Sequence, residues 1–279
     1  MGRKQNNRKL IYIDIALCLL GILYYLSAFF SDGIPHYINE DTYFHINRLI
    51  GLANVFFSPV SFKSFANNGT YVNIFYPWLT MYPMFILYRM FNSYVLAYKL
   101  YYLLLSIVTV FISFYCMRRI TRENWSSFCF AVVYSFSSYR FSNIFYRVAL
   151  GESIAMAFFP IILVGLYLIL YEDFCSWRLL SVGIALVAYS HVLSLLLVGT
   201  IVILHFLISL LRMNFKIMRI KAFIKSILLS LCFSCGAIIP MIQAYFSNSV
   251  FHPDGNVEIV KANAIGLADI LYNSISNVP

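Results

Sequence analysis

Residues 152–171 read ESIAMAFFPIILVGLYLILY, an apolar run whose one charged residue, Glu152, stands at its start. A hydrocarbon core about 30 Å thick requires roughly 20 residues of a spanning helix, so this run predicts a transmembrane helix. The whole chain has the same character: 61% of its 279 residues are hydrophobic and only 11% are charged. Soluble domains spend about a quarter of their residues on charge. The composition therefore excludes a soluble protein and indicates a polytopic membrane protein.

Seven runs in all are apolar enough to predict spanning helices. The third and fifth are short, and one end of each is expected in the headgroup layer. A further apolar stretch, 75–91, is interrupted by Pro77 and Pro83, so it predicts a helix lying half in the outer leaflet rather than a span. We expect an all-α transmembrane bundle of about seven spans, with a long outer loop, 31–93, that contains amphipathic helices. The seven runs are residues 10–30, 94–117, 125–141, 152–171, 179–191, 192–211 and 225–245.

The basic residues predict the orientation of the chain. Short cytoplasmic loops are enriched in Lys and Arg, and with a cytoplasmic amino terminus most of the 20 basic residues, including Arg118, Arg119 and Arg122, fall on the inside. The sequence thus predicts a multi-pass protein of the plasma membrane with its amino terminus in the cytoplasm. Because these residues face anionic headgroups, the net charge of +9 indicates membrane lipid, and no nucleic acid, as a partner.

The first outer loop contains two adjacent acids, Glu40 and Asp41, followed at helical spacing by His45 and Arg48. One interpretation makes Asp41 the cap of a helix and Arg48 an anchor whose charged end reaches the membrane surface. The other makes Asp41 a catalytic carboxylate in a hydrated cavity. In that interpretation Glu40 modulates the charge of Asp41, and His45 binds phosphate or tunes the acid.

Two further outer turns carry ionisable groups. Arg140, Arg147 and Glu152 stand between two spans, and His191 lies in the next outer turn. Ionisable groups at a membrane are costly unless they meet partners or water, so they are functional candidates. A structural Arg–Glu pair and a satisfied interfacial His are the alternatives. Since all three turns face one side of the membrane, a shared cavity is the economical explanation.

Four motifs resemble those of the GT-C superfamily of membrane glycosyltransferases. They resemble more closely a bacterial polytopic family labelled "6-pyruvoyl-tetrahydropterin synthase-related membrane protein". The zinc-binding histidines of the soluble pterin enzyme have no counterpart here, so that chemistry is not expected. The motifs are NEDTYFHINR (39–48), NIFYPWL (73–79), YRFSNIFYRVALGESIA (139–155) and YSHVLS (189–194).

The resemblance implies transfer of a sugar from a polyprenyl-phosphate donor to a cell-envelope glycan or lipid acceptor at the outer face of the membrane. Asp41 corresponds to the acid that takes the proton from the acceptor hydroxyl in an inverting displacement. Glu40 would assist it or bind the acceptor, and Glu152 would position the acceptor or a divalent cation. Whether a cation takes part is left open, since the carboxylates are too few to decide. The aromatic segment 75–91 is expected to line a groove for the isoprenoid chain.

The residue types themselves indicate which groups meet the donor. Arg140, Arg147 and His191 are candidates for stabilising the leaving phosphate, because the planar fork of Arg matches phosphate geometry.

Relatives in the family are longer. We therefore expect residues 1–245 to form a GT-C-like transmembrane module and 246–279 to be the start of an outer region, truncated here. Two alternatives to an enzyme stay open: a lipid or polysaccharide translocation protein, and a non-catalytic scaffold or inactive fragment.

Overall fold

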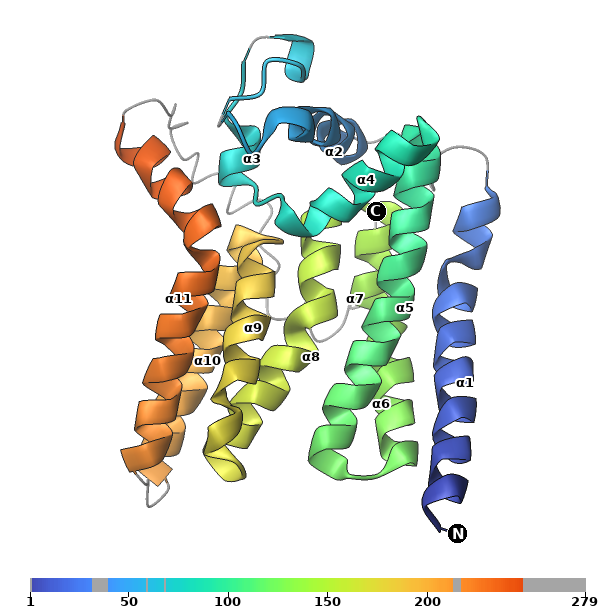
Figure 1. Cartoon of the computed structure of the whole chain (residues 1–279), viewed down its shortest axis with the longest axis vertical. Helices are drawn as coiled ribbons and strands as arrows, with labels where there is room; N and C mark the ends of the chain where they lie inside the picture. Colours follow the sequence, from blue (N-terminus) through green and yellow to red (C-terminus); the bar gives the residue numbers. More distant parts are fainter. Residues whose placement is uncertain (1, 32–39, 59, 68, 213–216, 248–279) are drawn as a thin grey trace, which may run out of the picture. The chain divides into compact units, whose positions relative to one another are not determined.

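The computed structural model describes residues 2–31, 40–58, 60–67, 69–212 and 217–247 (Figure 1). Within these ranges every regular element is a helix, and the extended backbone pairs at one isolated antiparallel bridge, Ser61–Thr70. The predicted all-α fold is confirmed to this extent. The chain divides into two compact units, 1–241 and 242–279, and the helix bundle and the candidate site belong to the first. Most of the predicted outer region, from 248 onward, lies outside the described residues.

Five helices are long and apolar enough to cross a membrane. They match five of the seven predicted runs. The last of them begins eight residues before the predicted run at 225, and Arg219 and Lys221 lie in its first two turns. The five are α1 (Gly2–Phe30), α5 (Tyr94–Thr121), α8 (Leu150–Tyr171), α10 (Val192–Arg212) and α11 (Ile217–Phe246).

The other two runs form shorter helices. α6 (Asn124–Ser135) and α9 (Trp177–Ala188) have 12 residues each. At about 1.5 Å per residue such a helix is about 18 Å long, well short of a hydrocarbon core of about 30 Å. A 3-10 turn, η5 (Phe174–Ser176), precedes α9. The count of seven spans therefore stays a prediction.

The run 125–141 was expected as one helix and is not. α6 ends at Ser135, and a short helix, α7 (Ser138–Phe141), and a π-helical turn, η4 (Ser142–Tyr146), follow after a break. Three of the four residues 135–138 are serines. Serine is a weaker helix former than the apolar residues before it, which favours the interruption at this point.

Close backbone contacts hold the bundle together. α5 contacts α1, α4, α6 and α8, and α8 packs along α9. A β-carbon on Gly21 would lie 2.6 Å from the Cα of Ile107, and one on Gly165 would lie 2.5 Å from the backbone nitrogen of Leu180. Lipid tails are as apolar as the helices, so close packing at small residues is a main source of helix association in membranes. The α1–α5 and α8–α9 pairs are therefore the rigid supports of the site.

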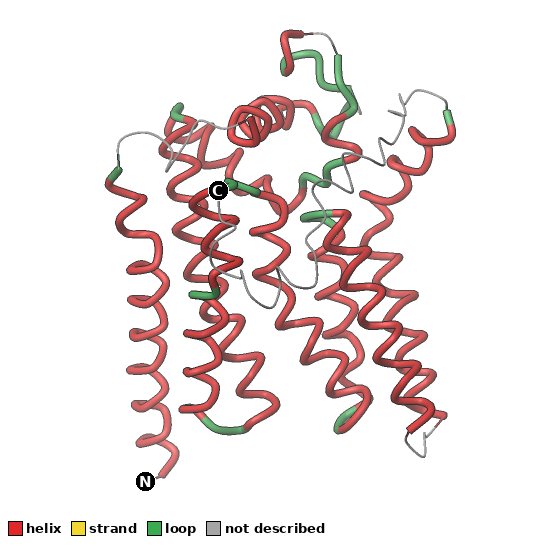
Figure 2. The backbone as a smooth tube through the Cα atoms, turned by 180° about the vertical axis from the view of Figure 1, so that it is seen from behind, coloured by secondary structure: helices red, strands yellow, loops and turns green. Residues whose placement is uncertain are grey.

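The long loop folds into short helices at one end of the bundle. Figure 1 shows α2, α3 and α4 where α1 ends and α5 and α8 begin, and Figure 2 shows the same arrangement from behind. We call this the α2 end. Pro77 stops α3 because a proline disfavours helical backbone at the residue before it, so the predicted interruption of 75–91 is confirmed. The loop elements are α2 (Glu40–Gly51), η1 (Leu52–Asn54), η2 (Phe65–Asn67), α3 (Val72–Phe75), η3 (Leu79–Met81) and α4 (Tyr82–Phe91).

Candidate functional site

Arg48 joins α2 to the segment after α3. Its side chain is 1% exposed and donates from Nε to Asn73 Oδ1 (3.3 Å), from Nη1 to His45 Nδ1 (3.2 Å) and from Nη2 to the carbonyl oxygens of Tyr76 and Pro77 (3.0 Å each). The guanidinium carbon also lies 4.4 Å from the centre of the Tyr76 ring. The interpretation of Arg48 as a surface anchor is therefore wrong, because acceptors far along the chain hold it inside. Burial lowers the pKa of Arg48 to about 10, so the side chain stays charged at neutral pH.

His45 is buried beside this arginine and is neutral. Burial lowers the pKa of His45 well below its usual value, and the charge of Arg48, together with that of His191 when His191 is protonated, lowers it further. Since Arg48 donates to Nδ1, the proton of the neutral ring is on Nε2. At 3% exposed, His45 is better placed to tune its neighbours than to bind a phosphate directly.

Asp41 lies at the exposed start of α2. The helix begins at Glu40, so Asp41 is inside the first turn rather than at the cap, where a carboxylate still interacts favourably with the helix dipole. Its charge reaches Tyr76 and helps to raise the pKa of that phenol. The side chain of Glu40, the other predicted acid, lies outside the described residues.

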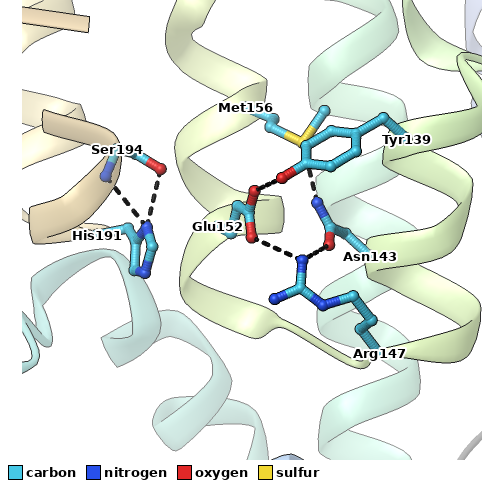
Figure 3. A network of polar contacts seen from close by, with 7 residues as sticks. All are labelled: Tyr139, Asn143, Arg147, Glu152, Met156, His191 and Ser194. Atoms are coloured by element: carbon cyan, nitrogen blue, oxygen red, sulfur yellow. Dashed lines mark hydrogen bonds and ion pairs between the residues drawn. The ribbon is translucent and has the colours of Figure 1, made fainter. Parts of the chain in front are cut away.

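Glu152 lies in the first turn of α8 and is held by two partners (Figure 3). Tyr139 donates its hydroxyl to Oε1, and Arg147 Nη1 lies 3.4 Å from Oε2. The same nitrogen donates to Asn143 Oδ1 at 2.9 Å. The Arg147 side chain is 52% exposed and that of Glu152 is 18% exposed. The predicted Arg–Glu pair is thus present.

The backbone between these two residues is strained. Val148 has φ +55°, which is rare for a β-branched residue and costs of order 1–3 kcal/mol. It persists because both sides are fixed: the amide of Arg147 donates to Ser142 O and the amide of Ala149 to Asn143 O, each at 2.9 Å. Strain of this kind gathers at functional sites. Here it lies between Arg147 and Glu152, whose side chains form the ion pair.

His191 lies in the turn between α9 and α10. Its Nδ1 accepts from the Ser194 amide at 3.3 Å and lies 2.8 Å from the Ser194 hydroxyl, so the proton of the neutral ring is on Nε2. Burial lowers the pKa of His191, Glu152 opposes the decrease, and Arg48 and Arg147 add to it. At neutral pH the ring is an uncharged donor.

Gly151 lets three elements meet. A β-carbon there would lie 3.0 Å from Tyr76 Cε1, 3.0 Å from Ser190 O and 3.3 Å from His191 Cδ2. The centres of the Tyr76 and His191 rings are 5.7 Å apart. The start of α8 therefore touches both the loop segment and the α9–α10 turn.

Tyr76 is the common neighbour of the predicted residues. Burial raises the pKa of its phenol, Asp41 and Glu152 raise it further, and Arg48 and Arg147 oppose them. Four stretches of chain are thus brought together. Three of them are the outer turns that the sequence singled out, and the fourth, with Tyr76, is not among them; a hydrated cavity among them stays a prediction. We call the group the polar cluster, and its members are Asp41, His45, Arg48, Tyr76, Arg147, Glu152 and His191.

Arg140 does not join the polar cluster. It is 0% exposed, donates from Nη2 to Thr109 Oγ1 (2.8 Å) and from Nη1 to Ser135 O (3.4 Å), and its guanidinium carbon lies 5.4 Å from the centre of the Tyr24 ring. It was expected beside Arg147 and Glu152 as a phosphate ligand. Arg140 follows the break after α6, and the short α7 turns its side chain toward α5 and α1 instead. This arrangement makes Arg140 a buried support.

An apolar groove of about 760 Å³ adjoins the polar cluster. Ligand pockets typically measure about 300–1,000 Å³. Thr80 and Tyr189 line it, and Thr80 Oγ1 donates to Tyr189 O at 2.8 Å. Since Tyr189 is two residues from His191, groove and cluster share the α9–α10 turn. The segment 75–91 does line a groove, as expected, and an isoprenoid occupant stays a prediction. Other lining residues are Leu79, Pro83, Tyr101, Leu104, Leu105 and Phe158.

The sequence-based selection of site residues missed Tyr76, Asn73, Tyr139 and Asn143. All four stand in the motifs that carry the family resemblance, 73–79 and 139–155. Their place in these motifs was the sequence signal that could have identified them, whereas a selection by ionisable side chains favours Asp, Glu, His and Arg. Among the described residues, no three His, Cys, Asp or Glu side chains come together as metal ligands.

No family model, no curated protein and no solved structure matches the chain.

Proposed function

We propose that the protein is an inverting membrane glycosyltransferase of the GT-C type. It moves a sugar from a polyprenyl-phosphate donor to a cell-envelope glycan or lipid acceptor at the outer face of the plasma membrane. The observation that carries the proposal is the polar cluster beside the apolar groove. A polyprenyl phosphate has a long apolar chain and an anionic head, so a protein that acts on it needs both kinds of surface side by side.

In the proposed step, the oxygen of an acceptor hydroxyl forms a bond to the anomeric carbon as the bond from that carbon to the phosphate oxygen breaks. The electron pair of the broken bond leaves on the polyprenyl phosphate, and the hydroxyl proton passes to Asp41. The exposed position of Asp41 suits a base that must reach an acceptor from outside. Glu40 assists Asp41 or binds the acceptor.

Charge that develops on the leaving phosphate meets preorganised donors. Arg147 is half exposed, and His191 carries its proton on Nε2. Donors fixed before the reaction stabilise developing charge without reorganisation. Glu152 fixes Arg147 and positions the acceptor. Arg48 has its hydrogen bonds committed inside the protein, so it contributes a fixed positive charge rather than a contact.

The test is consumption of labelled polyprenyl-phosphate sugars by the purified full-length chain in proteoliposomes that contain envelope lipid and glycan acceptors. Asp41→Asn should lower turnover by about 10²–10⁴-fold, the usual contribution of a general base, with donor binding retained. Asp173→Asn, at the opposite end of the bundle, is the matched control and should keep full turnover. A wild type that consumes no donor, or an Asp41→Asn variant as active as wild type, would contradict the proposal and favour translocation or a scaffold.

A further inference from the structure

Two adjoining cavities lie at the end of the bundle away from the polar cluster. A pocket of about 570 Å³ is lined by Tyr115, three arginines at the end of α5, and the acids Glu172 and Asp173 after α8. A neighbouring groove of about 580 Å³ runs between α5, α8 and α9 and is lined mostly by apolar side chains. Tyr115 and Arg119 line both, so the polar pocket opens directly into the apolar groove.

The lining carries more positive than negative charge. Arg118, Arg119 and Arg122 line the pocket, and Arg178 lines the groove. Of the two acids, Glu172 forms an ion pair with Arg122 at 3.2 Å. Four arginines therefore face two carboxylates.

The second acid is also engaged. Asp173 accepts from the amide of Cys175 at 3.0 Å and from the hydroxyl of Ser176 at 2.7 Å, as the cap of η5. Its oxygens are thus turned to the start of a helical turn, and the arginines keep a surplus of donors for an anion.

We propose that this pocket and groove together bind one anionic phospholipid from the bilayer leaflet at this end. The phosphate lies on Arg118, Arg119 and Arg178, and an acyl chain lies along the apolar wall formed by Leu168 and Leu179. Basic pockets between transmembrane helices that open to lipid are suited to anionic headgroups. The groove favours a whole lipid over free phosphate, since a soluble anion would leave the apolar wall uncovered.

The neighbouring side chains fit a position at the headgroup layer. The guanidinium carbon of Arg178 lies 5.6 Å from the centre of the ring of Trp177, which is partly buried, and Trp and Arg are typical of membrane interfaces. Bound lipid would join the ends of α5 and α9. At this end the Arg122–Glu172 ion pair joins the end of α5 to the end of α8. This site is independent of the proposed glycosyl transfer.

The test is binding of phosphatidylglycerol to the purified full-length chain in detergent, followed by native mass spectrometry. Phosphatidylcholine with the same chains and glycerol phosphate are the comparison ligands. Arg119→Gln/Arg178→Gln should weaken phosphatidylglycerol binding by roughly ten- to thirtyfold, since each interfacial cation contributes about 1 kcal/mol. Arg89→Gln, which removes one positive charge at an exposed position of α4, should leave binding unchanged.

A second variant tests the groove separately. Leu179→Trp fills this groove without removing charge and should also weaken phosphatidylglycerol binding. Leu179 is preferred to Val182 because Val182 also lines the apolar groove beside the polar cluster. Equal binding of phosphatidylcholine, equal binding of glycerol phosphate, or full binding by the double variant would each overturn the proposal. So would an equal loss in Arg89→Gln, since charge alone would then explain it.

Discussion

Replacing Arg48 by Met should release α2 from the segment after α3. The substitution keeps an apolar stem but removes the donors to Asn73, His45 and the carbonyl oxygens of Tyr76 and Pro77. A buried acceptor left without a donor costs about 1–3 kcal/mol. Four acceptors lose their donor. If local rearrangement satisfies about half of them, the remaining two give a destabilisation of about 3 kcal/mol, which corresponds to roughly a 100-fold increase in local opening.

Hydrogen–deuterium exchange of the purified protein measures this opening. The amides of α2 and of residues 72–76 should lose about 100-fold in protection, whereas those of α5 should change little because α5 is packed by other helices. Arg89→Met, on the exposed face of α4, is the matched control and should have no effect. Arg48→Lys should be intermediate, since an ammonium group cannot reach four acceptors at once. Protection in α2 within threefold of wild type would refute the role given to Arg48.

Three further predictions concern packing, pH and the groove. Gly151→Ala should destabilise the protein by about 1–3 kcal/mol, because the added β-carbon would meet atoms at 3.0 Å. In the control Gly199→Ala the added β-carbon meets nothing within 4 Å, so stability should be unchanged or rise by up to about 1 kcal/mol. Thermal unfolding measures both variants. Stability should fall as the pH drops below about 6.5: the pKa of His45 is lowered in the folded state, so the unfolded chain takes up the proton first. The difference between the unfolding midpoints at about pH 5 and pH 7.5 should therefore become smaller in His45→Gln, with the contribution of His191 remaining, but not in His205→Gln, which changes an exposed side chain on α10. Leu104→Trp should fill the groove beside the polar cluster and weaken donor-lipid binding about tenfold, and unchanged binding would show that the lipid lies elsewhere.

The sequence was sufficient to predict the long helices and the side of the bundle on which ionisable groups gather. A largely apolar run of 20 residues, such as 152–171, leaves few alternatives, since a spanning chain must satisfy its backbone within a helix. The proline at 77 likewise predicted the break after α3. These features depend on neighbours in sequence.

The environments of Arg48 and Arg140 could not be predicted in this way. Arg48 is buried because Asn73, 25 residues away, turns its amide toward it, and nothing in the spacing of α2 shows that. Arg140 depends on where α6 stops, and its partner Thr109 lies 31 residues earlier. Tertiary packing decides where helices end and which distant polar groups pair, and the local pattern of a single sequence does not show that packing.

The central claim is that the polar cluster and its adjoining groove form the donor site. A polyprenyl phosphate with a photoreactive group near the phosphate, cross-linked to the purified chain and mapped by mass spectrometry, tests this most directly. We predict labels within residues 76–83 and 189–191, reduced by competition with unlabelled polyprenyl phosphate. Specific labels confined to the opposite end of the bundle, or labelling at the α2 end that unlabelled lipid does not reduce, would contradict it.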